Sequence, residues 1–252
     1  MILNGSELGS GPPVALLHGL FGSAVNFGTV QKRLAERYRV ISLDLRNHGQ
    51  SPHAPFMSYP AMAEDVLETL RSRNALPCAL VGHSMGGKVA MAAALEAPGA
   101  VSRLLVADIA PAIYPPLFRG YAEAMAAMPL AADLTRIAAD RFLAATVDNP
   151  GIRAFLLQNL RFGAESSWRI GLDAIINALP QIEGWPELDE GAYLGQVLFV
   201  AGARSDYIRA EHRPIIRELF PSARFAVLKN AGHWLHADNP EGFVSLVDAF
   251  LA

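Results

Sequence analysis

Cysteine is almost absent from this chain of 252 residues, in which Cys78 is the single example. One thiol cannot form an internal disulfide, and such scarcity is typical of a reducing compartment, so we expect a cytoplasmic location. Cys78 lies at the start of an apolar run. This position favours a small buried hydrophobic residue over a redox site.

A strong excess of charge of either sign is also missing, because 21 Lys and Arg residues stand against 24 Asp and Glu residues. Without a basic cluster, neither nucleic acid nor an anionic membrane is an expected partner. No apolar stretch approaches the ~20 residues of a membrane-spanning helix, and the first residues lack the pattern of a signal peptide. The chain also lacks the His-Glu-x-x-His pattern and the Cys/His clusters of metal sites, so no metal is expected.

Short apolar runs alternate with helix-like segments along a chain that is 52% hydrophobic, which is enough for one sizeable core. The apolar runs show no polar alternation, which indicates strands buried on both faces of a mainly parallel sheet flanked by helices. Strands are predicted at residues 14–19, 39–45, 78–83, 102–110, 196–202 and 223–229, and helices at 25–38, 59–73, 85–97, 210–220 and 240–252.

The rhythm of strands breaks between residues 112 and 194, where Ala-, Leu- and Arg-rich helical stretches are punctuated by proline and glycine. We interpret residues 112–194 as a helical cap, without strands, inserted into a core formed by residues 1–111 and 195–252. The cap separates two strands of one sheet. We therefore expect it over the edge where the strands end, which is where ligands bind in open α/β sheets.

The pentapeptide Gly82-His83-Ser84-Met85-Gly86 lies between a predicted strand and a predicted helix. This context is typical of a nucleophile elbow, in which a tight turn exposes the serine hydroxyl. The backbone N–H of Met85 can then face a developing oxyanion. A second donor is expected from the glycine-rich loop "HGLFGS". Leu20 is the first choice for it, and Phe21 is the second choice and also a wall of an acyl pocket.

A serine needs a neighbouring base, and His233 in "NAGHWLHAD" follows the last predicted strand. The chain order serine, aspartate, histidine favours His233 over the nearby His236. His83 is expected to point away from Ser84. The remaining histidines are predicted to have structural or surface roles: His18 in packing and backbone hydrogen bonds, and His48, His53 and His212 at the surface or in loops.

The acid that orients the histidine has two main candidates, Asp108 and Asp206, which both follow predicted strands between Ser84 and His233. Asp108 could instead cap a turn, and Asp206 could be a solvated loop charge. The residues alone leave this choice open.

Three further polar residues near these motifs are interpreted as structural. Arg46 and Asn47 in "DLRNHGQS" are expected to tie loops together around the elbow. Lys88 follows the elbow in the first turns of a helix, where the helix dipole does not favour a cation. We expect it to pair with a neighbouring acid.

The strings "LLHGLFGS", "LDLRNHGQSPH", "VGHSMGGKVAM", "DIAP" and "AGHWLHAD" together resemble the α/β-hydrolase superfamily over essentially the whole chain. The resemblance is to small YbfF-type esterases and their eukaryotic α/β-hydrolase-domain relatives. It implies the α/β-hydrolase fold, a Ser-His-Asp esterase with Ser84 and His233, a helical cap and no cofactor. Ser205 occupies the customary place of the acid, so the resemblance favours Asp108, with Asp206 second and the cap residue Asp173 a remote third.

The expected reaction is hydrolysis of short- to medium-chain acyl esters, or of acyl-CoA thioesters, through an acyl-enzyme. Phe21 and Trp168 are predicted to line an apolar pocket, and Ser205 to support the histidine. The same residues are compatible with a C–C bond hydrolase, a cofactor-free haloperoxidase or a slow-turnover ligand sensor. The protein is expected as a monomer or homodimer.

Overall fold

A computed structural model describes residues 1–186 and 191–252 of the chain. Its main sheet has seven strands in the order β1-β3-β2-β4-β5-β8-β9, and β1 alone pairs antiparallel in it. The prediction of a mainly parallel sheet is therefore confirmed. The strands span Gly5–Leu8 (β1), Pro13–Leu17 (β2), Arg39–Leu43 (β3), Cys78–His83 (β4), Val101–Ala107 (β5), Gln196–Gly202 (β8) and Ala223–Leu228 (β9).

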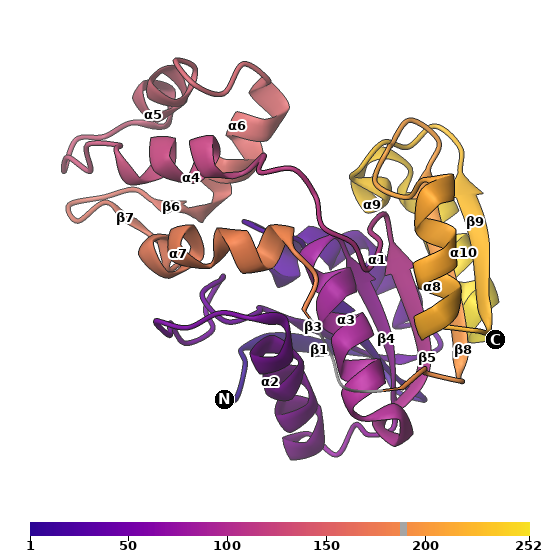
Figure 1. Cartoon of the computed structure of the whole chain (residues 1–252). Coiled ribbons are helices and arrows are strands. Elements are labelled where there is room, and N and C mark those ends of the chain that lie inside the picture. The colour runs from indigo at the N-terminus through magenta and orange to yellow at the C-terminus, as the bar shows by residue number, and fades with distance from the viewer. Residues whose placement is uncertain (187–190) are drawn as a thin grey trace.

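Helices cover both faces of this sheet (Figure 1). On one face α2 and α3 pack together, and on the other α1 and α10 share a hydrophobic cluster with the strands. The helices span Gly28–Leu34 (α1), Tyr59–Ser72 (α2), Met85–Glu96 (α3), Arg213–Leu219 (α8), Leu235–Asp238 (α9) and Pro240–Leu251 (α10), with short 3-10 turns at Ala24–Phe27, Pro98–Ala100, Leu157–Asn159 and Ala210–His212. The long apolar runs lie between the two helical layers, which explains why they show no polar alternation.

Within residues 112–194, the elements between Arg119 and Glu183 form a separate group at one end of the sheet (Figure 1), which we call the cap. Tyr193 lies outside this group, because its hydroxyl donates to the carbonyl oxygen of Val101 at the start of β5. Within the cap, α4 packs on α7. The expectation of no strand was wrong here, because Leu160 and Trp168 pair in a small antiparallel hairpin. Its two-residue strands are too short for a periodic signal. The cap elements span Arg119–Ala126 (α4), Arg136–Leu143 (α5), Pro150–Leu156 (α6), Leu160–Arg161 (β6), Ser167–Trp168 (β7) and Leu172–Glu183 (α7).

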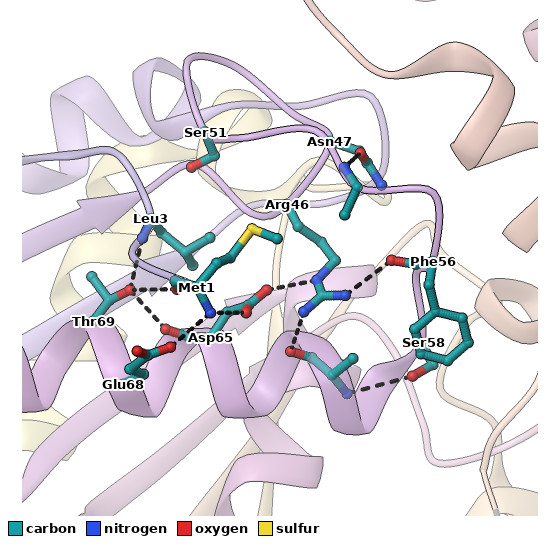
Figure 2. Close-up of polar contacts among 12 residues, drawn as sticks. Met1, Leu3, Arg46, Asn47, Ser51, Phe56, Ser58, Asp65, Glu68 and Thr69 are labelled. Carbon is teal, nitrogen blue, oxygen red and sulfur yellow. Dashed lines mark hydrogen bonds and ion pairs between the residues drawn. The ribbon is translucent and has the colours of Figure 1, made fainter.

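The loop after β3 is tied to α2 by one buried arginine (Figure 2). Nε of Arg46 donates to Asp65 at 2.6 Å, and its other nitrogens donate to the carbonyl oxygens of Phe56 and Ala61, both at 2.9 Å. The amino group of Met1 contacts the second oxygen of Asp65. Arg46 therefore has the structural role that was expected of it.

Asn47 extends the same loop to the cap. Its side-chain oxygen accepts from the backbone N–H of Ala54 at 2.8 Å. Its carbonyl oxygen accepts from the N–H of Gly171, which precedes α7, at 2.9 Å. Asn47 therefore connects the core to the start of α7, in agreement with the structural interpretation.

Replacing Arg46 with methionine is expected to lower the free energy of unfolding by about 3 kcal/mol, because it leaves the carboxylate of Asp65 buried with fewer partners. Urea unfolding followed by circular dichroism measures this loss. The matched control is Arg37→Met, which removes an exposed ion pair with Asp248 and should cost less than about 1 kcal/mol. Equal effects of the two substitutions would contradict the assigned role of Arg46.

No helix among the described residues is long and apolar enough to cross a membrane.

Candidate active site

The elbow between β4 and α3 places Ser84 in a strained conformation, with φ at 52°. Two neighbouring glycines make this turn possible. A Cβ atom on Gly82 would lie 2.2 Å from the carbonyl oxygen of Gly86, and one on Gly86 would lie 2.3 Å from that of Leu17. Since real Cβ contacts are never this short, any side chain at either position would disrupt the turn that presents the serine.

The hydroxyl of Ser84 lies in a continuous chain of hydrogen bonds. Its oxygen is 3.1 Å from Nε2 of His233, and Nδ1 of the same ring is 2.8 Å from Oδ2 of Asp108. The three residues come from the elbow, from the loop after β9 and from the end of β5. The fold thus brings together the predicted nucleophile, the predicted base and the favoured acid, in the geometry that serine activation requires.

Asp108 is completely buried, and both of its carboxylate oxygens are engaged. Oδ1 accepts from the backbone N–H of Gly202 at 2.9 Å. Oδ2 accepts from the hydroxyl of Ser205 as well as facing His233. Ser205 therefore supports the histidine through the carboxylate, which is a more specific role than the sequence indicated.

The two alternative acids lie elsewhere. Asp206 is exposed next to Ser205, and its carbonyl oxygen accepts from the side chain of Arg209. Asp173 is in the first turn of α7 and lines a different surface depression. Neither side chain has a hydrogen bond to His233 within the part of the chain that the structure describes.

Two backbone N–H groups are available for an oxyanion. Leu20 lies in a turn and Met85 is the first residue of α3. Among the described residues, neither N–H group has a hydrogen bond to a backbone acceptor of a turn, loop or helix cap. A Cβ atom on Gly19 would lie 3.3 Å from Cβ of Ser84, so the loop of Leu20 approaches the elbow closely. The N–H of Phe21, the second choice, donates instead to Nε2 of His48 at 3.2 Å. Leu20 and Met85 are the donors that the geometry favours.

His48 was predicted at the surface or in a loop. It lies in the loop after β3, but its ring is fully buried beside that of His18. Both rings accept a backbone N–H at Nε2, His18 from Leu45 and His48 from Phe21, and bond to a backbone carbonyl through Nδ1. Burial lowers the pKa of His48 to about 3 and lowers that of His18. These neutral rings shape the loop of Leu20, as was expected of His18 alone. Of the two other histidines, His53 is exposed in a loop and His212 is half-buried in a 3-10 turn.

The rings of His83, Tyr207 and Trp234 lie next to that of His233. Nε2 of His83 donates to the carbonyl oxygen of His233 at 2.7 Å, which holds the loop of the base. His236, in the short helix α9, packs against Phe27. Burial lowers the pKa of His236 to about 4. The ring of Tyr207 stacks on His233 with centroids 3.9 Å apart and an interplanar angle of 20°. The stacking of Tyr207 was missed, because no local pattern links residues 207 and 233.

An apolar cavity of about 260 Å³ opens onto Ser84 and His233 between the core and the cap. Phe21 lines it, as predicted, but Trp168 does not. The indole N–H of Trp168 donates to the carbonyl oxygen of Met125, and the ring borders a separate depression near α7. The aromatic and aliphatic lining instead includes Leu117, Phe118, Tyr121, Phe155 and Trp234.

The contacts of Lys88 also differ from the prediction that it pairs with a neighbouring acid. Within the described residues its Nζ bonds to main-chain carbonyl oxygens of the cap and forms no ion pair with an acid. The described residues also contain no group of three His, Cys, Asp or Glu side chains that could hold a metal ion.

Comparison with known proteins identifies the family of this chain. The family model described as "alpha/beta hydrolase fold" matches residues 12–240. A Mus musculus protein named sn-1-specific diacylglycerol lipase ABHD11 is 42% identical over 96% of this chain and 81% of its own length. Esterase YbfF of Escherichia coli (strain K12) is 34% identical over 95% of this chain and 92% of its own length. A solved structure titled "Marine microorganism esterase" superposes with a TM-score of 0.96, 35% identity and 99% coverage of both chains. This chain belongs to the α/β-hydrolase family and has its fold.

Proposed function

We propose that this protein is a carboxylic ester hydrolase that cleaves short- to medium-chain acyl esters, with Ser84 as nucleophile, His233 as base and Asp108 as acid. The observation that carries the proposal is the chain of hydrogen bonds from Ser84 through His233 to the buried Asp108, at the mouth of an apolar cavity. The relatives named esterase and diacylglycerol lipase support ester hydrolysis as the reaction class.

The mechanism follows from the positions of these groups. Nε2 of His233 takes the proton of Ser84 as Oγ attacks the ester carbonyl, and the N–H groups of Leu20 and Met85 stabilise the tetrahedral oxyanion. The imidazolium then gives its proton to the leaving alcohol, and an acyl ester remains on Ser84. A water molecule, deprotonated by His233, cleaves this ester and releases the carboxylic acid.

The buried carboxylate of Asp108 supports this proton transfer in two ways. It accepts a hydrogen bond from Nδ1–H, which leaves Nε2 free to act as the base, and it stabilises the positive ring that forms. The bonds from Gly202 and Ser205 hold the carboxylate in place. The stacked ring of Tyr207 holds the face of the imidazole.

The chain-length preference of the enzyme should follow the size of its cavity. Each methylene buried in an apolar wall contributes about 0.8 kcal/mol, which is roughly fourfold in kcat/KM. From p-nitrophenyl acetate to butyrate, which adds two methylenes, we therefore expect a rise of about fifteenfold, and no further rise from octanoate to palmitate, whose chain exceeds a cavity of about 260 Å³. Steady-state kinetics on this ester series measure the profile. A continued rise to palmitate would contradict the proposed substrate class.

Other substrates distinguish the proposed activity from the alternatives. Butyryl-CoA and octanoyl-CoA test thioester cleavage, and a dispersed 1,2-diacylglycerol tests the substrate named for the mouse relative. A single burst of p-nitrophenol followed by a stall would identify a slow-turnover sensor. Cleavage of a β-diketone without cleavage of any ester would identify a C–C bond hydrolase, and either result would refute the proposed function.

A further inference from the structure

The two chain segments that join the cap to the core meet at one buried lysine. Lys88 lies one helical turn after Ser84 in α3 and is 1% exposed. Its Nζ donates at 2.8 Å to the carbonyl oxygen of Ala112, where the cap begins. It also donates to the carbonyl oxygen of Gly184, directly after α7, and lies 3.5 Å from that of Glu183. One amino group of the core therefore contacts both ends of the cap.

Hydrogen bonds join the same two segments to each other. The N–H of Tyr114 donates to the carbonyl oxygen of Glu183 at 2.8 Å. The carboxylate of Glu183 accepts from the N–H groups of Leu117 and Phe118 at 2.8 and 3.0 Å. Because Glu183 already holds the beginning of the cap, the contacts of Lys88 fix the joined pair of segments to α3.

We call the contacts of Lys88 with the two cap segments the anchor. Two tyrosines add to it. The amino group of Lys88 lies 4.8 Å from the ring centre of Tyr114 and 5.5 Å from that of Tyr59, which favours the charged form at those faces. The hydroxyl of Tyr59, from α2, donates to the carbonyl oxygen of Ile182. The last turn of α7 is thus held by both α2 and α3.

From these contacts we infer that Lys88 is a positioning residue that holds both ends of the cap against α3 and so sets the wall of the acyl cavity. This inference rests on the proposed esterase function, since it concerns the pocket of the same site. Lys88 contacts no substrate atom in this role and acts through the segments that it holds.

The anchor lies directly behind the nucleophile. A small cavity of about 20 Å³ is lined by Ser84, Lys88 and Phe118, among others. Phe118 and Leu117 also line the acyl cavity. Because these two side chains belong to the segment that the anchor holds, we expect the width of the acyl cavity to depend on the anchor.

The burial of this amino group is costly. Burial lowers the pKa of Lys88 to about 7, and the carboxylate of Glu183 acts in the opposite direction. An apolar side chain of similar length avoids this cost, although the carbonyl oxygens of Ala112 and Gly184 then lose the donor Lys88. Lys88→Met therefore removes the contacts with the cap without leaving a charge buried.

The test uses p-nitrophenyl acetate, which barely enters the acyl cavity, and p-nitrophenyl octanoate, which fills it. For Lys88→Met we expect KM for octanoate to rise about tenfold, while kcat/KM for acetate stays within about threefold of the wild type. Lys88→Gln, which keeps an uncharged donor, should give an intermediate KM. Lys32→Met, at an exposed lysine of α1, should leave both substrates unaffected.

Amide hydrogen exchange tests, without any substrate, whether Lys88 holds the two cap segments in place. Amides of residues 110–118 and 182–184 should exchange faster in Lys88→Met than in the wild type, and Lys32→Met should match the wild type. Equal losses on acetate and octanoate, or unchanged exchange in both segments, would overturn the role of Lys88. If Lys88→Met does not fold, the same two measurements on Lys88→Gln decide. A wild type inactive toward every ester refutes the esterase function, and the exchange result still judges the anchor.

Discussion

Replacing Ser84 with alanine is expected to lower kcat/KM for p-nitrophenyl butyrate by about 10⁴-fold or more, which is the scale of removing a nucleophile from a serine hydrolase. Ser84 is the hydroxyl that His233 reaches, at 3.1 Å, and it lies beside the proposed oxyanion site of Leu20 and Met85. The residual rate should come from that site and from substrate binding alone. Initial rates at matched enzyme concentration measure the loss.

The control for this substitution is Ser245→Ala, which removes an exposed hydroxyl from α10 and should leave the rate unchanged. Labelling with a fluorophosphonate provides a second measurement. The wild type and Ser245→Ala should take up one equivalent of the label, and Ser84→Ala none. An alanine variant that keeps more than about a tenth of the activity would remove Ser84 from the mechanism, because loss of the nucleophile costs a serine hydrolase far more than tenfold.

The second large effect is expected from Asp108→Asn, which should lower kcat by about 10⁴-fold, because an amide in place of the carboxylate favours the wrong tautomer of the histidine. The carboxylate of Asp108 faces Nδ1 of His233 at 2.8 Å and is completely buried. The asparagine has almost the same shape. The loss should therefore appear in kcat more than in KM, and measurement of both parameters on butyrate separates these effects.

Asp206→Asn is the matched control, since Asp206 is the rival acid and its side chain is exposed. We expect its kcat to stay within about twofold of the wild type, because its exposed side chain has no hydrogen bond to His233 among the described residues. The unfolding transition of Asp108→Asn should also be recorded, because a misfolded variant loses activity for another reason. Should Asp206→Asn be the inactive variant of the two, the acid would have to be reassigned.

The strands of the core were predictable because each is a local apolar run. The predicted strand at residues 78–83 coincides with β4, and the one at 196–202 coincides with β8. The edge strand β1 was missed, since its four residues are largely exposed and carry no such run. The hairpin of β6 and β7 was missed because each of its strands has only two residues. Prediction thus succeeded where burial on both faces leaves a long apolar signal in the chain.

Side-chain positions were harder to predict than strands. His48 was predicted at the surface or in a loop, and its loop folds back and buries its ring against His18. Trp168 was assigned to the acyl pocket because it is aromatic and lies in the cap, yet Trp234 lines the cavity instead. Residue type and loop membership do not specify which way a side chain faces, since packing against distant segments decides it.

Local sequence was sufficient for the elbow at Ser84, because its glycines, the strand before it and the helix after it are all neighbours in the chain. The choice between Asp108 and Asp206 required the folded molecule. β5 and β8 lie side by side in the sheet, so the end of β5 meets Gly202 and Ser205 and is buried there, while Asp206 stays in solvent. The two cap ends held by Lys88 are likewise about seventy residues apart in the chain and meet through packing alone. Backbone conformation depends mainly on neighbouring residues, whereas burial and long-range hydrogen bonds exist only once distant segments have packed together.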